Sequence, residues 1–192
     1  MKKWSIVATA AVLGLPSPAF GGVHAAEKLK VGFIYLGPIG DLGWTYQHDV
    51  SRRAMEQALG DKIETTTYIE NVPESADAER SIEQLVRTGH KLIFATSFGY
   101  MDATLKIANK YPNVFFEHCA GYKRAKNMST YDRRDYEGRY ISGQIAAKMS
   151  KTGTIGYIVP FSIPPVISNI KRDDARRPVG PARHQGEDHL GV

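Results

Sequence analysis

The sequence LKVGFIYLGPIGDLGWTYQHD, residues 29–49, decides the fold of this chain. It opens with a near-continuous apolar run that contains Val31, Phe33 and Ile34, which is typical of a parallel strand buried on both faces. A glycine-rich loop follows, and then a segment with helical character. The stretch therefore predicts a strand, a loop and a helix, which is the repeating unit of an α/β sheet.

The same alternation continues along the chain. The first helix should run from about residue 45 to 59. Its apolar stripe at i+4 spacing would consist of Tyr46, Val50, Ala54 and Ala58. Further helices are expected at about 76–88, 100–110 and 136–149, and further strands at 63–70, 92–95, 114–117, 128–131 and 154–159. Strands that alternate with helices imply a parallel, doubly wound sheet with right-handed crossovers.

Composition and charge are those of an ordinary globular protein. Hydrophobic residues make up 42% and charged residues 23% of the sequence. The length of 192 residues suffices for one α/β domain with a hydrophobic core. The formal net charge is +5, but the basic residues are scattered, and nucleic-acid binding needs a basic stripe with stacking aromatics. We therefore expect a solvated basic surface and no nucleic-acid partner.

The sequence carries no motif for a cofactor or a metal. The spacing of Gly37, Gly40 and Gly43 differs from the dinucleotide fingerprint, and no Walker phosphate loop occurs. The six histidines lack metal-binding spacing. We expect no cofactor and no metal.

The first residues predict export. Lys2 and Lys3 precede a short apolar run at residues 4–15, and small residues at 23–26 form an A-x-A-like cleavage site. The run is too short to span a bilayer, so we predict a signal peptide at residues 1–26. The only cysteine is Cys119, far from that site, so no lipid anchor is expected and an internal disulfide is excluded.

Polar and aromatic side chains gather where the first strand ends. In open α/β sheets, ligands bind beyond the carboxyl ends of the strands, which places Asp41, Trp44 and Tyr46 near a planar, polar small molecule. Asp41 either binds that ligand or serves as a turn former or helix cap. Trp44 should face the cleft, where its ring can stack on a flat heterocycle, whereas Tyr46 also fits the core stripe of the helix.

The segment after the third strand is a second candidate contact. It opens a helix with Ser97, Phe98, Gly99 and Tyr100. Its backbone N–H groups either hold a polar edge of the ligand or simply cap the helix.

Later strand ends add three more candidates. His118 follows the fourth strand beside Cys119, but neighbouring strand residues point to opposite faces, and a nucleophile needs its base within reach. We therefore expect His118 near the ligand and Cys119 as a small buried residue. Tyr122 would lie at the rim of the cleft, and Phe161 would contact the ligand from beyond the last strand.

Five stretches of the chain resemble the basic membrane protein (BMP) family, and together they cover nearly everything from Leu29 to Ile170. They are LKVGFIYLGPIGDLGWTYQHD, YIENVPESADAERSIEQLV, LIFATSFGYMDATLKIA, FFEHCAGY and YEGRYISGQIAAKMSKTGTIGYIVPFSIPPVIS. The family consists of substrate-binding proteins of ABC importers with the type I periplasmic-binding fold, and it includes purine-nucleoside receptors. The resemblance implies capture of ligand between two lobes, hinge closure and delivery to a membrane permease.

The resemblance also implies a domain plan and a ligand. Residues 27–131 would form most of lobe one, and residues 132–170 only the start of lobe two. The implied protein is periplasmic, is not an enzyme and binds a purine base or nucleoside. Trp44-Thr45 stands where the nucleoside receptors carry an aromatic residue and Asn, so the exact ligand stays open. The alternatives are a small exported α/β hydrolase that uses Asp41 or Glu117, and an inactive fragment of the binding protein.

Residues 171–192 break the α/β pattern. Arg, Asp, Pro, Gly and His dominate there, without a helix or strand period, which indicates an irregular, disordered tail. A change of reading frame after Ile170 is the second interpretation. One permitted codon choice for residues 171–175, read one base later, encodes Asn-Ala-Met-Thr and continues as an amphipathic helix that resembles the family.

Overall fold

β1 (Leu29–Ile34) is an interior strand of a five-stranded parallel sheet in the computed structural model, which describes residues 27–159 and 162–174. It pairs with β2 (Ile63–Ile69) on one edge and with β3 (Leu92–Ala95) on the other. Burial on both faces explains the continuous apolar run of β1. The predicted α/β fold with a parallel sheet is confirmed.

The sheet extends beyond β3 through β4 (Phe115–Cys119) and β5 (Met128–Tyr131), in the order β2-β1-β3-β4-β5. β3 and β5 have the predicted bounds. The order reverses direction at β1, because the chain moves outward to β2 and then returns to the opposite side for β3. This reversal creates a topological switch point between β1 and β3, where such sheets bind ligands.

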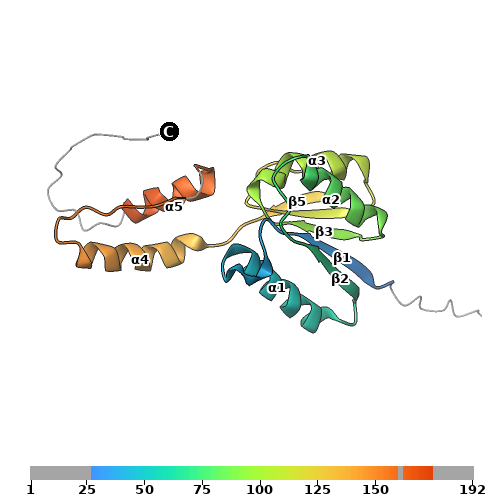
Figure 1. Cartoon of the computed structure of the whole chain (residues 1–192), viewed down its shortest axis with the longest axis horizontal. Coiled ribbons are helices and arrows are strands. Elements are labelled where there is room, and N and C mark those ends of the chain that lie inside the picture. Colours follow the sequence, from blue (N-terminus) through green and yellow to red (C-terminus); the bar gives the residue numbers. More distant parts are fainter. Residues whose placement is uncertain (1–26, 160–161, 175–192) are drawn as a thin grey trace, which may run out of the picture.

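Helices cover the two faces of the sheet unequally (Figure 1). α2 (Ala76–Arg87) and α3 (Met101–Lys110) lie on one face and share the larger core with it. α1 (Trp44–Leu59) lies on the other face, over a smaller core around β1 and β2. Phe115 of β4 is 60% exposed, so part of this second face is open to solvent beside α1.

Local sequence signals explain the covered face. The N-cap residue of α2, Ser75, accepts a hydrogen bond from the Asp77 backbone N–H at 3.2 Å. Asp77 and Glu79 stand near the positive end of the α2 dipole. The helix then buries Ala78, Ile82 and Leu85 against the sheet.

The predicted apolar stripe of α1 is wrong. Val50, Ala54 and Ala58 are exposed, and the buried residues of the helix are Thr45 and Asp49. The inward face carries Met55 against this smaller core. It also carries Asp49, which accepts a hydrogen bond from Arg52 Nε at 2.8 Å and pairs with Arg53 as well. A buried carboxylate is tolerated where cationic partners neutralise it.

The segment after the sheet departs from two further predictions. Residues 154–159, predicted as a strand, have no regular secondary structure, since a strand needs a neighbour to pair with and the described residues supply none there. α5 (Pro164–Asp174) runs through residues 171–174, which were predicted to be irregular. Residues 175–192 lie outside the described part, so neither interpretation of the tail is tested.

α4 (Asp135–Met149) and α5 lie side by side, apart from the sheet, after an extended connection from β5 (Figure 1). α4 buries no residue completely. Its apolar residues Ile141, Ile145 and Met149 are 58%, 53% and 75% exposed. An apolar surface of this kind favours association.

We predict that Ile145→Glu makes the chain more soluble and lowers its binding of the dye ANS, because it removes apolar surface from α4. Gln144→Glu is the matched control, since it adds the same charge at an exposed neighbouring position. Both variants should keep the free energy of unfolding of the sheet within about 0.5 kcal/mol of the parent. Equal dye binding by the two variants would contradict the prediction.

Candidate ligand-binding site

The carboxyl ends of β1 and β3 form the floor of the candidate site. Ile34 stands beside Ile69 of β2 and Ala95 of β3, so the three strands end at the same level. The loop after β1 turns back into α1, and the loop after β3 leads to α3 on the other face. One bond crosses between these loops: Trp44 Nε1 donates to the backbone oxygen of Thr96 at 2.6 Å.

Asp41 acts as the cap of α1. The N-cap position is Gly43, which has no side chain to offer, and the Asp41 carboxylate takes over that role. Oδ1 accepts the N–H groups of Gly43 and Tyr46 at 2.7 and 3.0 Å, and Oδ2 accepts that of Thr45 at 3.2 Å. The Gly43 bond, with the two others, lowers the pKa of Asp41. The exposed carboxylate can still accept a further bond from a ligand, because it has about four acceptor sites.

Trp44 is half-buried and held from several sides. Besides its bond to Thr96, its ring lies against the His48 ring at a centroid distance of 5.1 Å. The guanidinium carbon of Arg133 lies 3.9 Å from the centroid of the Trp44 ring. Tyr46, the next predicted contact, is half-buried on α1.

The loop after β3 already holds a carboxylate of the protein itself. Glu74, from the loop after β2, accepts hydrogen bonds from Ser97 Oγ and from the Gly99 N–H, the latter at 2.9 Å. Glycine at position 99 leaves room for this carboxyl group, because a Cβ there would push it aside. Glu74 therefore already binds donors of the loop that is predicted to hold a polar edge of the ligand.

Tyr100 belongs to the core rather than to the surface of the site. It is fully buried, and its hydroxyl donates to the backbone oxygen of Val72 at 2.5 Å. Phe98 remains half-buried, with its ring centroid 6.4 Å from that of Tyr122, which is 67% exposed. Phe98 and Tyr122 thus form an accessible aromatic pair at this end of the sheet.

His118 is fully buried at the end of β4, and neither ring nitrogen has a hydrogen-bond partner. The chain turns sharply over it, with Ala120 in the left-handed region (φ 62°) and Gly121 so close that a Cβ would collide with His118 Nδ1. Burial lowers the pKa of His118 to about 4, although the Ser97 backbone acts weakly in the opposite direction. A buried imidazole without hydrogen bonds costs folding free energy, and a hydrogen bond to either nitrogen would reduce that cost.

Cys119 is buried, as predicted for a structural residue. Burial raises the pKa of its thiol to about 11, so little of the reactive thiolate would exist at neutral pH. Phe161 lies outside the described residues, as does the predicted signal peptide.

The structure thus brings Asp41, Trp44 and Ser97 to the same switch point. Sequence reasoning missed Glu74, Thr96 and Arg133, which contact these residues from distant parts of the chain. The position of Thr96 directly after β3 was a usable signal for it. Glu74 and Arg133 gave no local signal.

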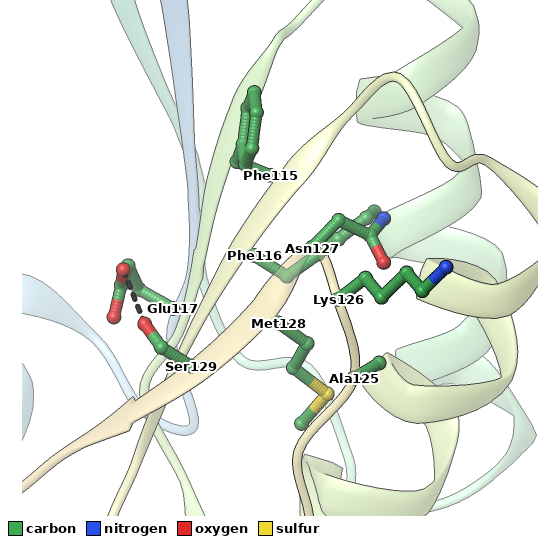
Figure 2. A pocket seen from close by; sticks show the side chains of 8 residues that line it. All are labelled: Phe115, Phe116, Glu117, Ala125, Lys126, Asn127, Met128 and Ser129. Atoms are coloured by element: carbon green, nitrogen blue, oxygen red, sulfur yellow. Dashed lines mark hydrogen bonds between the residues drawn. The ribbon is translucent and has the colours of Figure 1, made fainter.

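A small pocket lies elsewhere, over the β4 and β5 strands (Figure 2). It has a volume of about 120 Å³, well below the 300–1,000 Å³ of usual small-molecule sites. Figure 2 shows Glu117 and Ser129 joined by a hydrogen bond of 2.6 Å on one face of the sheet, with Met128 on the other. The pocket reaches the beginning of β4 at Phe115 and is not the predicted site.

The residues that the structure describes contain no group of three His, Cys, Asp or Glu side chains arranged to hold a metal ion. Within the same residues, no helix has the length and apolar character needed to cross a membrane.

Solved structures share this fold. A protein described as a transcriptional activator of the comK gene from Bacillus halodurans superposes with a TM-score of 0.57 and 25% identity, over 75% of this chain and 48% of that one. An ABC transporter solute-binding protein from Conexibacter woesei gives a TM-score of 0.54 and 17% identity, over 62% and 40%. The fold is thus that of periplasmic-type solute-binding proteins, over part of their length.

The sequence defines the family more closely. Residues 28–172 match the Bmp family, described as ABC transporter substrate-binding protein PnrA-like, and the chain belongs to this family. It is a family of binding proteins and not of enzymes, so the alternative of a hydrolase is not supported. The resemblance stated from the sequence is confirmed.

Several relatives are named for a ligand. A purine-binding protein of Brucella abortus is 63% identical over 150 residues, which cover 78% of this chain and 43% of the relative. A Haloferax volcanii protein, provisionally named as an ABC transporter glucose-binding protein, is 40% identical over 150 residues, or 78% and 38%. The chain spans less than half the length of both relatives.

We predict that His118 makes the fold sensitive to acid. The imidazole is neutral in the folded state down to about pH 4 but takes up a proton in the unfolded chain below about pH 6.5. The unfolded state therefore binds more protons in this window, and stability falls as the pH falls. The loss from His118 between pH 7 and pH 5 should be about 2 kcal/mol.

Urea unfolding at both pH values, with His118→Met as the comparison, measures this loss. Methionine fills a similar volume without a titrating group, so the variant should lose about 2 kcal/mol less on acidification. The same loss in both proteins would show that His118 is not the acid-sensitive group.

Proposed function

We propose that this chain contributes the ligand-binding part of an exported solute-binding protein that delivers a purine base or nucleoside to an ABC permease. The observation that carries the proposal is the Trp44 ring at the switch point between β1 and β3, fixed by its bond to Thr96. A fixed indole suits a flat heterocycle, because stacking needs a rigid aromatic face. The 63% identity to a protein named as purine-binding supports this choice of ligand.

Further contacts follow from the same geometry. Asp41 lies in the loop that leads to Trp44 and retains acceptor capacity for a ligand N–H group. Tyr46, Phe98 and Tyr122 supply aromatic surface, and Ser97, Gly99 and Tyr100 build the loop that faces α1 across the switch point. His118 is fully buried, so it would bond to the ligand only if the turn at Ala120 opened. Phe161 is proposed as the contact from the second lobe.

Residues 27–131 are proposed as lobe one and residues 132–170 as the start of lobe two. Closure of the lobes over the ligand would then present the loaded protein to the permease. A sugar is the second candidate ligand, because one relative is provisionally named for glucose. Aromatic rings serve sugars as well, so a ligand panel has to separate the two.

We predict that Trp44→Ala weakens purine binding about 10- to 100-fold, since stacking on one aromatic ring is worth roughly 1–3 kcal/mol. Calorimetry with adenine, adenosine, hypoxanthine and glucose, raised to millimolar concentration, measures the change. High concentrations are needed because α4 and α5 lie apart from the sheet (Figure 1) and would enclose little of the ligand.

Two variants control this experiment. Trp44→Phe keeps a stacking ring without the bond to Thr96, and it should retain most of the affinity. Phe115→Ala removes an exposed aromatic side chain from the sheet and should change nothing. Tight binding of glucose that is indifferent to Trp44→Ala would refute the purine proposal.

We also predict that the protein is exported to the periplasm and cleaved, because residues 1–26 carry a basic start, a short apolar run and a small-residue site. N-terminal sequencing of exported material should begin at Ala26 or Glu27. Lys2→Glu with Lys3→Glu should reduce export by removing the basic region. Protein that retains Met1 in a soluble cytoplasmic fraction would overturn this prediction.

A further inference from the structure

The contact between Arg133 and Trp44 joins the switch point to the segment that leads into α4. Arg133 stands in the short connection between β5 and α4. Its guanidinium carbon lies 3.9 Å from the centroid of the Trp44 ring, within the range of an attractive cation–π contact. Trp44 and Arg133 are separated by 88 residues in the sequence, so the tertiary fold alone creates this contact.

Both partners are held by other groups. Arg133 Nε and Nη2 donate to the two carboxylate oxygens of Asp135 at 2.8 and 2.6 Å, which fixes the guanidinium plane. Trp44 is anchored through Nε1 to Thr96 and lies against His48. The cation therefore rests on the ring in one defined geometry rather than as a freely moving surface arginine.

The face of an indole can be covered by only one planar group at a time. A purine stacked on that face and the Arg133 guanidinium would require the same space, about one ring thickness above Trp44. Because Arg133 is tethered to Asp135 in the first turn of α4, any movement of Arg133 pulls on the start of that helix.

We propose that Arg133 is a built-in competitor that covers the ligand-binding face of Trp44 until a flat heterocycle displaces it. Displacement frees the connection between β5 and α4, so ligand occupancy is coupled to the position of α4. This inference rests on the proposed function, because it assumes that the ligand stacks on Trp44.

The competition is measured in a Trp4→Phe background of the full chain. The sequence has two tryptophans, Trp4 and Trp44, so the fluorescence of this variant reports on Trp44 alone. Adenine is titrated into this protein and into two further variants. Arg133→Ala removes the competitor, and Arg134→Ala removes the same charge from the next residue, which pairs with Glu137 at 3.2 Å instead.

Arg133→Ala should change the Trp44 emission without ligand and tighten adenine binding by about 2- to 30-fold, the range that a lost cation–π contact allows. Arg134→Ala should alter neither the emission nor the affinity by more than about twofold. Asp135→Asn, which loosens the tether of Arg133, should tighten binding in the same direction by a smaller factor.

Unchanged or weaker adenine binding in Arg133→Ala overturns the inference, and weaker binding would mean that the ligand stacks between Arg133 and Trp44. In either case the parent still binds adenine, so the proposed function survives. Absence of adenine binding in the parent and in Arg133→Ala alike would refute the proposed function and the inference together. Unchanged emission in Arg133→Ala would show that the contact does not form in solution.

Discussion

The pairing of β1 with β2 on one edge and with β3 on the other is the constraint on which the rest of the structure depends. It forces the loops after β1 and β3 to leave toward opposite faces of the sheet, and so it opens the switch point between them. The bond from Trp44 Nε1 to Thr96 then ties the two loops together at that point. Without β1 as the strand that β2 and β3 share, neither the Trp44 ring nor its anchor at Thr96 would have a defined position.

The polar groups of the site are already satisfied by the protein. Asp41 accepts three backbone N–H groups at the start of α1, and Glu74 occupies the donors of Ser97 and Gly99. Because a hydrogen bond exchanged for another yields little net free energy, a ligand gains more from the aromatic surface than from these groups. His118 is the exception, since its buried ring nitrogens have no partner and a new bond there would relieve an existing cost.

The covered face of the sheet could be predicted, whereas the α1 face could not. Ser75 caps α2 locally, and Ala78, Ile82 and Leu85 follow one helical stripe, so neighbouring residues carry all the information. On α1, two stripes of the same period compete, and hydrophobicity favours the one with Val50 and Ala54. The structure buries Asp49 instead, because Arg52 neutralises its charge. Residues 154–159 also depend on tertiary contacts. Their sequence has a strand pattern, but they form no strand, because no described strand pairs with them.

The sequence by itself determined the alternation of strands and helices, the parallel sheet, the family and the loops that meet at the carboxyl ends of the strands. These features follow from periodicity, caps and motifs, which act between residues close in the chain. Only the tertiary structure decided which partners fill the site: Glu74 on the loop at Ser97, Thr96 on Trp44 Nε1, and Arg133 on the Trp44 ring. The physical reason is that these contacts join residues far apart in the chain. Charge and ring geometry select the partners, and no local sequence pattern encodes such a choice.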